Sequence, residues 1–194
     1  MEETQAIHRL KRGELTGLEF LVRKHQAKAV YAAYLVLQDR QLAEDVVQNA
    51  FLRIYDRIRQ FDENRPFEPW FIRIVVNAAL DTAKKGNRWI SLETDPDKPS
   101  GIEVDWLKSD APSPQDLVET AEIRQTVRQS LRKLNAEQRA AIVLRYFLEM
   151  NETEMSAALH KPTSTIRWRL HEARRNLKEL LRTLYQSPDE PHEE

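Results

Sequence analysis

Apolar residues recur at helical spacing along most of the chain. From Leu15 to Leu37, and again from about Gln41 to Ile58, they fall three or four positions apart, with polar residues between them. This spacing gathers the apolar side chains on one face of an α-helix and leaves the other face polar. We therefore expect an amphipathic helix over each range, and a short helix near Thr4 to Lys11 before them.

The helical pattern breaks at the stretch FDENRPFEPW, residues 61–70. This stretch holds two prolines and three aromatic residues among charged ones. Proline lacks an N–H and restricts the residue before it, so it interrupts a helix. Helical spacing resumes near Phe67 or Pro69, since proline is tolerated in a first turn, and it continues to Gly86, where we expect a C-terminal cap. The sequence thus predicts a rigid aromatic loop between two amphipathic helices.

A proline-rich segment divides the chain. Residues 91–116 contain four prolines and show no sustained hydrophobic period, which is typical of a linker. The linker separates a helical domain over residues 1–90 from a second one over 117–185, which opens with a predicted helix over 117–134. An acidic tail over 186–194 is expected to be disordered. The predicted fold class is all-α, with two small helical domains joined by a flexible linker.

The second domain carries two helix-capping signatures. Asn135 is followed three residues later by Gln138, and Asn151 is followed by Glu154 in the same way. In such a capping box, each side chain satisfies a backbone N–H at the start of a helix. A turn at residues 160–162, which contains a proline, then leads into an arginine-rich helix.

A short capped helix, a tight turn and an arginine-rich helix together indicate a helix-turn-helix motif. In this motif the start of the second helix enters the DNA major groove, where arginine pairs with guanine and Ser or Thr reaches base edges or phosphates. The side chains that project away from the apolar stripe are Ser164, Thr165, Arg167, Trp168 and His171, and the positive charge is extended by Arg169, Arg174, Arg175 and Lys178. An ordinary amphipathic helix with a solvated charged face is the alternative, which the capped helix and the proline turn disfavour.

Charge is segregated along the chain, although the formal net charge is only −1. Residues 1–90 carry 15 basic and 12 acidic side chains, residues 91–120 carry 2 and 8, and residues 121–185 carry 13 and 7. Two basic blocks separated by an acidic one indicate two nucleic-acid-facing modules joined by an acidic strap. Ordinary surface charge is the alternative explanation.

Composition narrows the class of protein further. The 194 residues include no Cys, which excludes a disulfide framework and a Cys-ligated zinc site, and the five His residues are too scattered for a metal site. No apolar run approaches the ~20 residues of a membrane-spanning helix, and the polar N-terminus lacks the apolar core of a signal peptide. Neither a phosphate-binding glycine loop nor a nucleophile with a neighbouring base is found. We expect a soluble, cytoplasmic protein that is not an enzyme and needs no metal or cofactor.

A basic helix follows the aromatic loop. It presents Arg73, Asn77, Lys84 and Lys85 at positions that its apolar residues leave open. Aromatic faces that accept unstacked bases, next to cations that hold a backbone, suit a single strand better than a closed duplex. For Trp70, a plug in the core between helices is the favoured alternative.

Three stretches read together resemble a known family. They are AEDVVQNAFLRIY, FDENRPFEPWFIRIVVNAALD, and LNAEQRAAIVLRYFLEMNETEMSAAL with TIRWRLHEARRNLKELL. They are similar to segments of bacterial RNA polymerase sigma factors of the extracytoplasmic-function (ECF) group, in that family's order and with a linker between. The resemblance runs from about Leu15 to Leu184. It implies a region 2-like domain that binds and melts the −10 promoter element and a region 4-like domain that reads the −35 element.

The resemblance also implies roles for individual residues. Glu44, Asp45 and Gln48 would contact the clamp helices of core RNA polymerase. The loop from Phe61 to Phe67 would hold a flipped −10 base, and Asn77 would help to read the non-template strand. The full candidate set for −10 DNA is Phe61, Asp62, Glu63, Asn64, Arg65, Arg73, Asn77, Lys84 and Lys85. The candidate set for −35 DNA is Ser164, Thr165, Arg167, Trp168, His171, Arg174 and Arg175.

The partners that the resemblance implies are core RNA polymerase, promoter DNA and an anti-sigma factor. The sequence departs from the family at Ile72, where an aromatic residue is common, at Trp168, where a small residue is common, and at His160, which replaces the usual glycine of the turn. A stand-alone helix-turn-helix regulator is the alternative function, but it would not explain the aromatic loop or the AEDVVQ helix. A helical interaction adaptor, in turn, would show no salt-dependent DNA binding.

Overall fold

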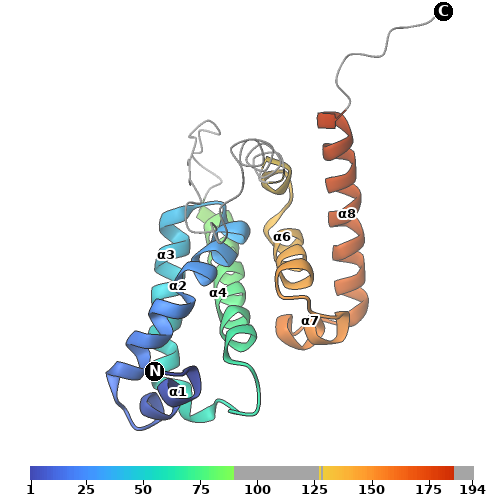
Figure 1. Cartoon of the computed structure of the whole chain (residues 1–194). Helices are drawn as coiled ribbons and strands as arrows, with labels where there is room; N and C mark the ends of the chain where they lie inside the picture. Colours follow the sequence, from blue (N-terminus) through green and yellow to red (C-terminus); the bar gives the residue numbers. More distant parts are fainter. Residues whose placement is uncertain (90–126, 128, 186–194) are drawn as a thin grey trace, which may run out of the picture.

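The computed structural model describes residues 1–89, 127 and 129–185. Within these residues every regular element is a helix, as the sequence predicts. The helices form two modules that lie side by side (Figure 1), which we call the N-terminal module, up to residue 89, and the C-terminal module, from residue 129. The predicted linker at 91–116 and tail at 186–194 lie outside the described residues.

The N-terminal module contains α1 (Glu3–Lys11), α2 (Leu15–Leu37), α3 (Arg40–Arg57), the 3-10 helix η1 (Ile58–Gln60) and α4 (Phe67–Trp89). The three helices predicted before the aromatic loop are confirmed. The predicted end of α4 at Gly86 is wrong, because the helix continues through Gly86 to Trp89. A glycine inside a helix costs only about 1 kcal/mol relative to alanine, so one glycine alone does not end a helix.

Local side-chain chemistry turns the chain between α2 and α3. Gln38 ends α2 in a left-handed conformation with φ of 60°, and its side-chain amide donates a hydrogen bond of 2.9 Å to the carbonyl of Leu35. Asp39 is then the N-cap of α3, and its carboxylate accepts a hydrogen bond of 2.9 Å from the N–H of Leu42. Because both helix ends are capped by adjacent residues, the corner needs only Gln38 and Asp39.

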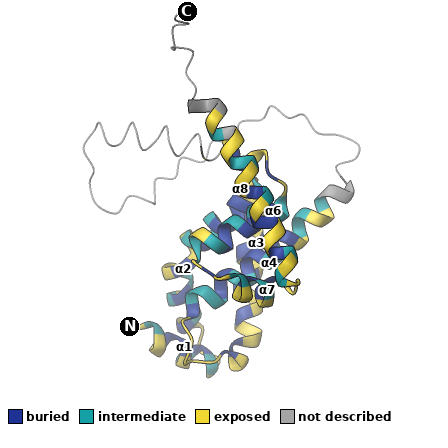
Figure 2. Ribbon diagram, turned by 90° about the vertical axis from the view of Figure 1, so that its right-hand side faces the viewer, coloured by how far each residue is buried: buried dark blue, intermediate teal, exposed yellow. Residues whose placement is uncertain are grey.

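The apolar stripes of α2, α3 and α4 meet in one core, which Figure 2 shows as a dark blue interior. Leu21 and Tyr34 contribute from α2, Phe51 from α3, and Phe71 and Val75 from α4, and all are buried. The rings of Phe51 and Phe71 lie 4.4 Å apart, centroid to centroid. Full burial of such a side chain stabilises the fold by about 1.5–3 kcal/mol. The core therefore fixes α3 and α4 relative to each other, together with the polar residues on their outer faces.

The C-terminal module contains α6 (Ala136–Ile142), the π-helical η3 (Val143–Phe147), α7 (Glu152–Leu159) and α8 (Thr163–Tyr185). Both predicted capping boxes are present, at Asn135 before α6 and at Asn151 before α7. His160 ends α7 with a φ of 51°, a conformation that glycine adopts without the cost of about 1–3 kcal/mol paid by other residues. The predicted helix-turn-helix is thus confirmed as α7, a turn and α8, with His160 at the strained position.

The two modules are in direct contact. Arg139 of α6 donates a hydrogen bond of 2.6 Å from Nε to the carbonyl of Val36, in the last turn of α2. The ring of Phe147 packs edge-on against Tyr31 of α2, with centroids 5.7 Å apart, and Lys28 lies over the same ring. The last carbonyls of a helix have no partner within the helix, so a guanidinium from another element satisfies one of them. Nothing in the predicted two-domain organisation indicated this packing.

Candidate nucleic-acid interface

The polar face of α3 is exposed. Glu44, Asp45 and Gln48 all lie at the surface, on the side of α3 away from its buried stripe. Arg40, one turn earlier, lies 2.7 Å from Glu44, between Nε and Oε1. Residues three and four positions apart share one side of a helix, so the two carboxylates and the amide are presented together.

An apolar groove runs beside this polar face, between α2 and α3. Its volume is about 470 Å³. Its lining consists of Leu18, Val22, Gln26, Val30, Glu44, Val47, Gln48, Phe51 and Leu52. Leu52 is 58% exposed although it is a large apolar residue. The predicted acidic face is therefore the edge of an apolar groove, the kind of surface that accepts an amphipathic helix.

The aromatic residues of the loop between η1 and α4 form a buried frame. Phe61 is 3% exposed and Phe67 is 1% exposed. Their ring centroids lie 5.7 Å apart, and Phe61 lies 4.7 Å from the partly buried Trp70. The frame accounts for the aromatic character of the stretch. It also places the ring of Phe61, a candidate for −10 DNA, in the frame and away from the surface.

The polar residues at the tip of this loop are exposed, and three of them, Asp62, Asn64 and Arg65, are bonded to one another. We call residues 61–66 the promoter loop, after the role that the sequence resemblance implies for it. The carboxylate of Asp62 accepts hydrogen bonds from the backbone N–H and from the side-chain amide of Asn64, at 3.1 and 3.0 Å. Arg65 lies 3.5 Å from the other oxygen of Asp62. Asn64 thus directs a side-chain N–H at Asp62, and no residue that the structure describes bonds its carbonyl oxygen.

Two of the predicted DNA-facing residues of α4 point at the C-terminal module. The side-chain amide of Asn77 donates a hydrogen bond of 2.8 Å to the backbone carbonyl of Ala158. Lys84 lies 3.8 Å from Glu137 of α6, between Nζ and Oε1. Arg73 is partly exposed and Lys85 is exposed. The four candidates of α4 are therefore divided between the contact with the other module and the open surface.

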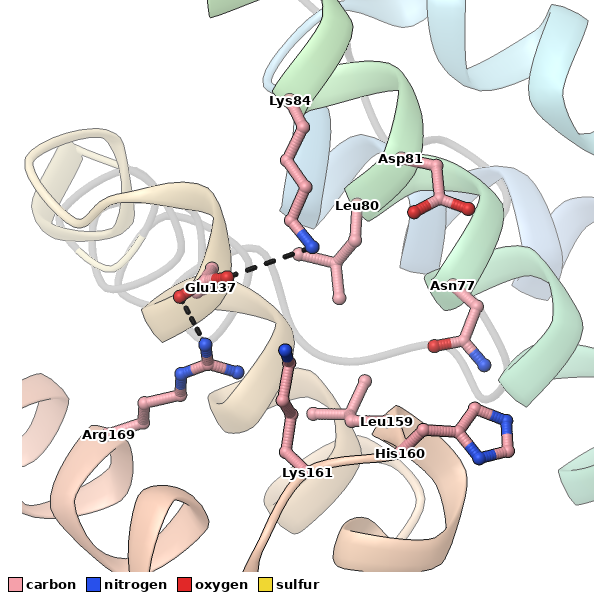
Figure 3. Close-up of a pocket in the computed structure, with 9 residues that line it drawn as sticks. All are labelled: Asn77, Leu80, Asp81, Lys84, Glu137, Leu159, His160, Lys161 and Arg169. Atoms are coloured by element: carbon pink, nitrogen blue, oxygen red, sulfur yellow. Dashed lines mark hydrogen bonds and ion pairs between the residues drawn. The ribbon is translucent and has the colours of Figure 1, made fainter.

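Figure 3 shows a small cavity between α4 and the C-terminal module. Its volume is about 260 Å³. Lys84 from one side and Arg169 from the other both point at Glu137, which lies between them. One carboxylate shared by two cations is a charge-assisted contact that links α4, α6 and α8.

The outer face of α8 presents the predicted DNA-reading residues. Ser164, Arg167, Trp168, His171, Arg174 and Arg175 are exposed, and Thr165 is partly exposed. Figure 2 shows exposed residues along this side of the helix. Trp168 is 61% exposed, which is unusual for an indole and leaves its ring available to a partner. Arg167 lies 2.6 Å from Glu152 of α7, and Arg175 lies 2.7 Å from Glu172.

Arg169, which was expected to extend the positive charge of the outer face of α8, lies elsewhere. It is 7% exposed and pairs with Glu137, because residue 169 lies on the same side of α8 as the buried Ile166 and Ala173. Three and four residues separate it from these neighbours, which is the spacing of one helix face. Its charge is therefore used in an ion pair with Glu137 inside the protein.

Sequence reasoning missed three side chains that shape these surfaces. Tyr146 is 58% exposed and accepts a hydrogen bond of 2.9 Å from Nε of Arg174. Lys11 and His8 of α1 contact Glu63 of the promoter loop. The partners are distant in the sequence, and periodicity reports only which face a residue occupies. Of these three residues, only Tyr146 could have been noticed in the sequence, as an aromatic residue within a basic segment.

The described residues show no group of three or more His, Cys, Asp or Glu side chains that could hold a metal ion. None of the helices in the part of the chain that the structure describes is long and apolar enough to cross a bilayer.

Two family models match the chain. The model for Sigma-70 region 2 matches residues 21–90, and the model for Sigma-70 region 4 matches residues 124–177. The first range includes the acidic face of α3, the promoter loop and most of α4, and the second includes the helix-turn-helix. The chain therefore contains matches to two sigma-70 regions, in the order region 2 and then region 4.

Known proteins are similar over nearly the whole length. The ECF RNA polymerase sigma factor SigW of Bacillus subtilis (strain 168) is 31% identical over 179 residues, covering 92% of this chain and 96% of SigW. The ECF RNA polymerase sigma-E factor of Escherichia coli (strain K12) is 28% identical over 171 residues, covering 87% of this chain and 88% of the relative. The two matched regions and their order define a sigma factor of the sigma-70 type. The chain belongs to the ECF RNA polymerase sigma factors, and it acts as a sigma factor in transcription initiation.

Solved structures show the same fold. The sigma factor RpoE of Bartonella quintana, in complex with the anti-sigma factor NepR, is 19% identical with a TM-score of 0.58, covering 84% of this chain and 96% of that one. CnrH, in complex with the cytosolic domain of CnrY, is 22% identical with a TM-score of 0.56, covering 93% of this chain and 97% of that one.

Proposed function

We propose that the two modules divide promoter recognition between them. The N-terminal module binds core RNA polymerase through the exposed face of α3 and captures a −10 base at the tip of the promoter loop. The C-terminal module reads the −35 element through α8. The observation that carries the proposal is the construction of the promoter loop, in which a buried aromatic frame supports an exposed polar tip.

The promoter loop fits base capture better than a plain surface loop. Its frame of Phe61, Phe67 and Trp70 limits its movement, so little conformational entropy is lost when a ligand binds. Its tip offers amide and carboxylate groups, which can hydrogen-bond to the edge of a base that has left the stack. Among the described residues, the side-chain oxygen of Asn64 has no hydrogen-bond partner, so it is open to a base.

The polymerase contact combines charge with apolar surface. Glu44, Asp45 and Gln48 are exposed beside the groove between α2 and α3. A helix of the polymerase with apolar residues on one face and basic residues at its edge would fill the groove and meet the two carboxylates. We therefore assign this face to the clamp helices of core RNA polymerase.

The −35 contact uses the start of α8. The exposed Arg167, Trp168 and His171 lie within two turns after the His160 turn, where a recognition helix meets base edges. Arg174 and Arg175, one turn further, are placed for phosphates, which position a protein on DNA without reading its sequence.

We also propose an anti-sigma factor as a partner, since two proteins of the same fold are held by partner proteins in their solved structures. Each surface assigned to polymerase or DNA is a surface that such a partner would cover. The protein acts in the cytoplasm, where polymerase and DNA are found, and has no catalytic activity of its own.

Substitution of Asn64 tests the proposal. Holoenzyme reconstituted with core RNA polymerase is assayed for sigma binding to core and for open-complex formation at a promoter that the wild-type chain transcribes. Asn64→Ala is expected to reduce open-complex formation and leave binding to core unchanged. Gln129→Ala, at an exposed position of the C-terminal module, is the matched control. An equal loss of core binding would make the promoter loop a structural element and overturn the assignment.

A further inference from the structure

Helix α1 lies at the end of the molecule that carries the promoter loop (Figure 1). The match to Sigma-70 region 2 begins at residue 21, so α1 lies outside it. The helix is nevertheless firmly packed, because Ala6, Ile7 and Leu10 are buried. Gly17 of α2 faces this contact, and a Cβ added there would lie 2.3 Å from the carbonyl oxygen of Ala6. A backbone approach this close fixes α1 on α2.

The outer face of α1 binds the promoter loop at two points. Nζ of Lys11 donates a hydrogen bond of 2.9 Å to the backbone carbonyl of Phe61. The same ammonium lies 2.5 Å from Oε1 of Glu63, and Nε2 of His8 lies 3.2 Å from Oε2. Both carboxylate oxygens of Glu63 are therefore engaged by α1. One lysine thus holds the loop by its backbone at the frame and by a side chain at the tip.

The contact of Lys11 with Glu63 is partly shielded from solvent, whereas the side chain of His8 is 54% exposed. The side chain of Lys11 is 24% exposed and that of Glu63 is 28% exposed. Charge-assisted hydrogen bonds are stronger than neutral ones, and a pair that is mostly shielded is screened less by salt than an open surface pair. The remaining tip residues, Asp62, Asn64 and Arg65, are bonded to each other. Glu63 is thus the tip side chain that ties the loop to another helix of the described structure.

The contact also changes the charge that DNA meets. An unpaired carboxylate at the loop tip would repel the phosphates of an approaching strand. The hydrogen bond from Lys11 lowers the pKa of Glu63, so this group stays ionised and remains a partner for the Lys11 ammonium and the His8 imidazole. The pairing with Lys11 therefore neutralises the charge of Glu63 at the loop tip.

We propose that α1 is a positioning element for promoter recognition, in which Lys11 and His8 hold Glu63 and the Phe61 carbonyl so that the tip of the promoter loop is preorganised for a −10 base. The inference rests on the proposed function of the loop and deepens it. Lys11, His8 and Glu63 are positioning residues, and Glu63 is removed from the set of direct base readers. A loop held in its binding geometry binds more tightly because less entropy is lost on binding.

The rival role for Glu63 is direct hydrogen bonding to the base. The two roles differ in how Glu63 and Lys11 depend on each other. If Glu63 acts through Lys11, removing either side chain removes the same contact, and the double variant is no worse than the single variants. If Glu63 reads the base, Glu63→Gln is defective while Lys11→Met is not.

The test measures base preference. Holoenzyme made from core RNA polymerase and the full chain transcribes a promoter library that is randomised in the −10 element and, separately, in the −35 element. Lys11→Met and Glu63→Gln are each expected to reduce the preference at −10 positions roughly three- to tenfold. The preference at −35 positions and the affinity for core should stay unchanged, and Lys11→Met with Glu63→Gln should equal either change alone. Arg12→Ala is the control, since Arg12 is exposed and pairs with Glu14.

The outcomes separate this inference from the function on which it rests. Asn64→Ala is measured in the same library. If Asn64→Ala alters the −10 preference while Lys11→Met behaves like Arg12→Ala, the positioning role of α1 is overturned and the loop remains the reader. If both leave the −10 preference unchanged, the function of the loop and the role of α1 fall together. Thermal unfolding of each variant shows whether α1 has detached, and Glu63→Gln tests the contact with α1 itself intact.

Discussion

The side-chain amide of Asn77 in α4 donates a hydrogen bond of 2.8 Å to the backbone carbonyl of Ala158 at the end of α7. Asn77 belongs to the helix that is assigned to −10 DNA, and Ala158 belongs to the module that is assigned to the −35 element. The amide of Asn77 keeps a second N–H and an oxygen acceptor, but its bond to Ala158 directs the side chain at the C-terminal module. If Asn77 turns to promoter DNA, as we propose, we expect this contact between the modules to open.

Module separation can be measured because the chain has no native cysteine. Ala27 of α2 and Ala157 of α7 are exposed, so Ala27→Cys with Ala157→Cys accepts two spin labels. We expect a single short distance in the isolated protein and a longer one in a complex with core polymerase and promoter DNA, measured by double electron–electron resonance. The same distance in both states would show that Asn77 does not exchange partners.

The shared carboxylate of Glu137 should contribute to stability. Arg169 is 7% exposed and Glu137 is its partner, with Lys84 as the second cation. Glu137→Gln leaves a buried guanidinium without a counter-charge, so we expect the free energy of unfolding to fall by about 1–3 kcal/mol. Denaturant unfolding checks this, with Glu149→Gln at an exposed position as the control. Equal stability of the two variants would contradict the role of Glu137.

Much of this fold follows from the sequence because its helices have strong local signals. The stripes of α2 and α3 and the capping boxes at Asn135 and Asn151 depend on residues within one turn of each other, and these elements were predicted closely. Gly86 was misread because helical bonding continued past a glycine that propensity alone would place at an end.

The exposure of many candidate residues was predicted, but their contacts were not. Exposure of Glu44 and Arg167 follows from periodicity, and exposure of the loop tip agrees with its run of polar residues. The contacts of Lys11 with Glu63 and of Asn77 with Ala158 join residues 52 and 81 positions apart in the sequence. Periodicity assigns a residue to a face and carries no information on which distant element covers that face. Arg169 is a different case: its spacing from Ile166 and Ala173 places it on the buried face of α8, and its charge led us to group it with the exposed cations.

Gly17→Ala should destabilise the protein, although a change from glycine to alanine inside a helix usually stabilises it. In an open helix this change gains up to about 1 kcal/mol. Here a Cβ would lie 2.3 Å from the oxygen of Ala6 and 2.8 Å from the nitrogen of Leu10, both backbone atoms. Because backbone cannot yield as a side chain does, α1 must shift, and we expect a loss of roughly 1–3 kcal/mol in the free energy of unfolding. The control is Ala27→Gly, at an exposed position of the same helix, which measures the effect of helix propensity alone. A Gly17→Ala variant that is more stable than the wild-type protein would refute the close contact.

Folding stability should depend on the protonation of His25. This residue is 1% exposed, and burial lowers the pKa of its imidazole below the ordinary value of 6.5, although Glu3 and Glu68 act in the opposite direction. The unfolded chain therefore binds a proton near pH 6.5 that the folded chain binds only at lower pH. The stability that neutral His25 contributes is complete above that pH and decreases as the pH falls below it.

His25→Gln isolates this effect, because glutamine can still hydrogen-bond to Glu3 but does not titrate. We expect the free energy of unfolding of the wild-type protein to fall relative to that of the variant between pH 7.5 and pH 5, on either side of the ordinary pKa of 6.5. Urea unfolding at several pH values measures the difference. Parallel pH profiles of the two proteins would show that His25 is not the source of the pH dependence of stability.

Arg167 gives the sharpest test of −35 reading, because its position is set by a partner on α7. Its Nε lies 2.6 Å from Glu152, so the guanidinium is held at the start of the recognition helix. Arg167→Ala should weaken binding to a duplex that contains the −35 element by roughly 1–3 kcal/mol and relax the preference at one base position. Arg182→Ala, exposed near the far end of α8, should leave the base preference unchanged. Binding is measured by fluorescence anisotropy at several salt concentrations, since a phosphate contact lowers the salt dependence whereas a base contact lowers the discrimination between sequences. A uniform loss of affinity on all sequences would place Arg167 on the DNA backbone and assign base reading to the exposed Trp168 and His171.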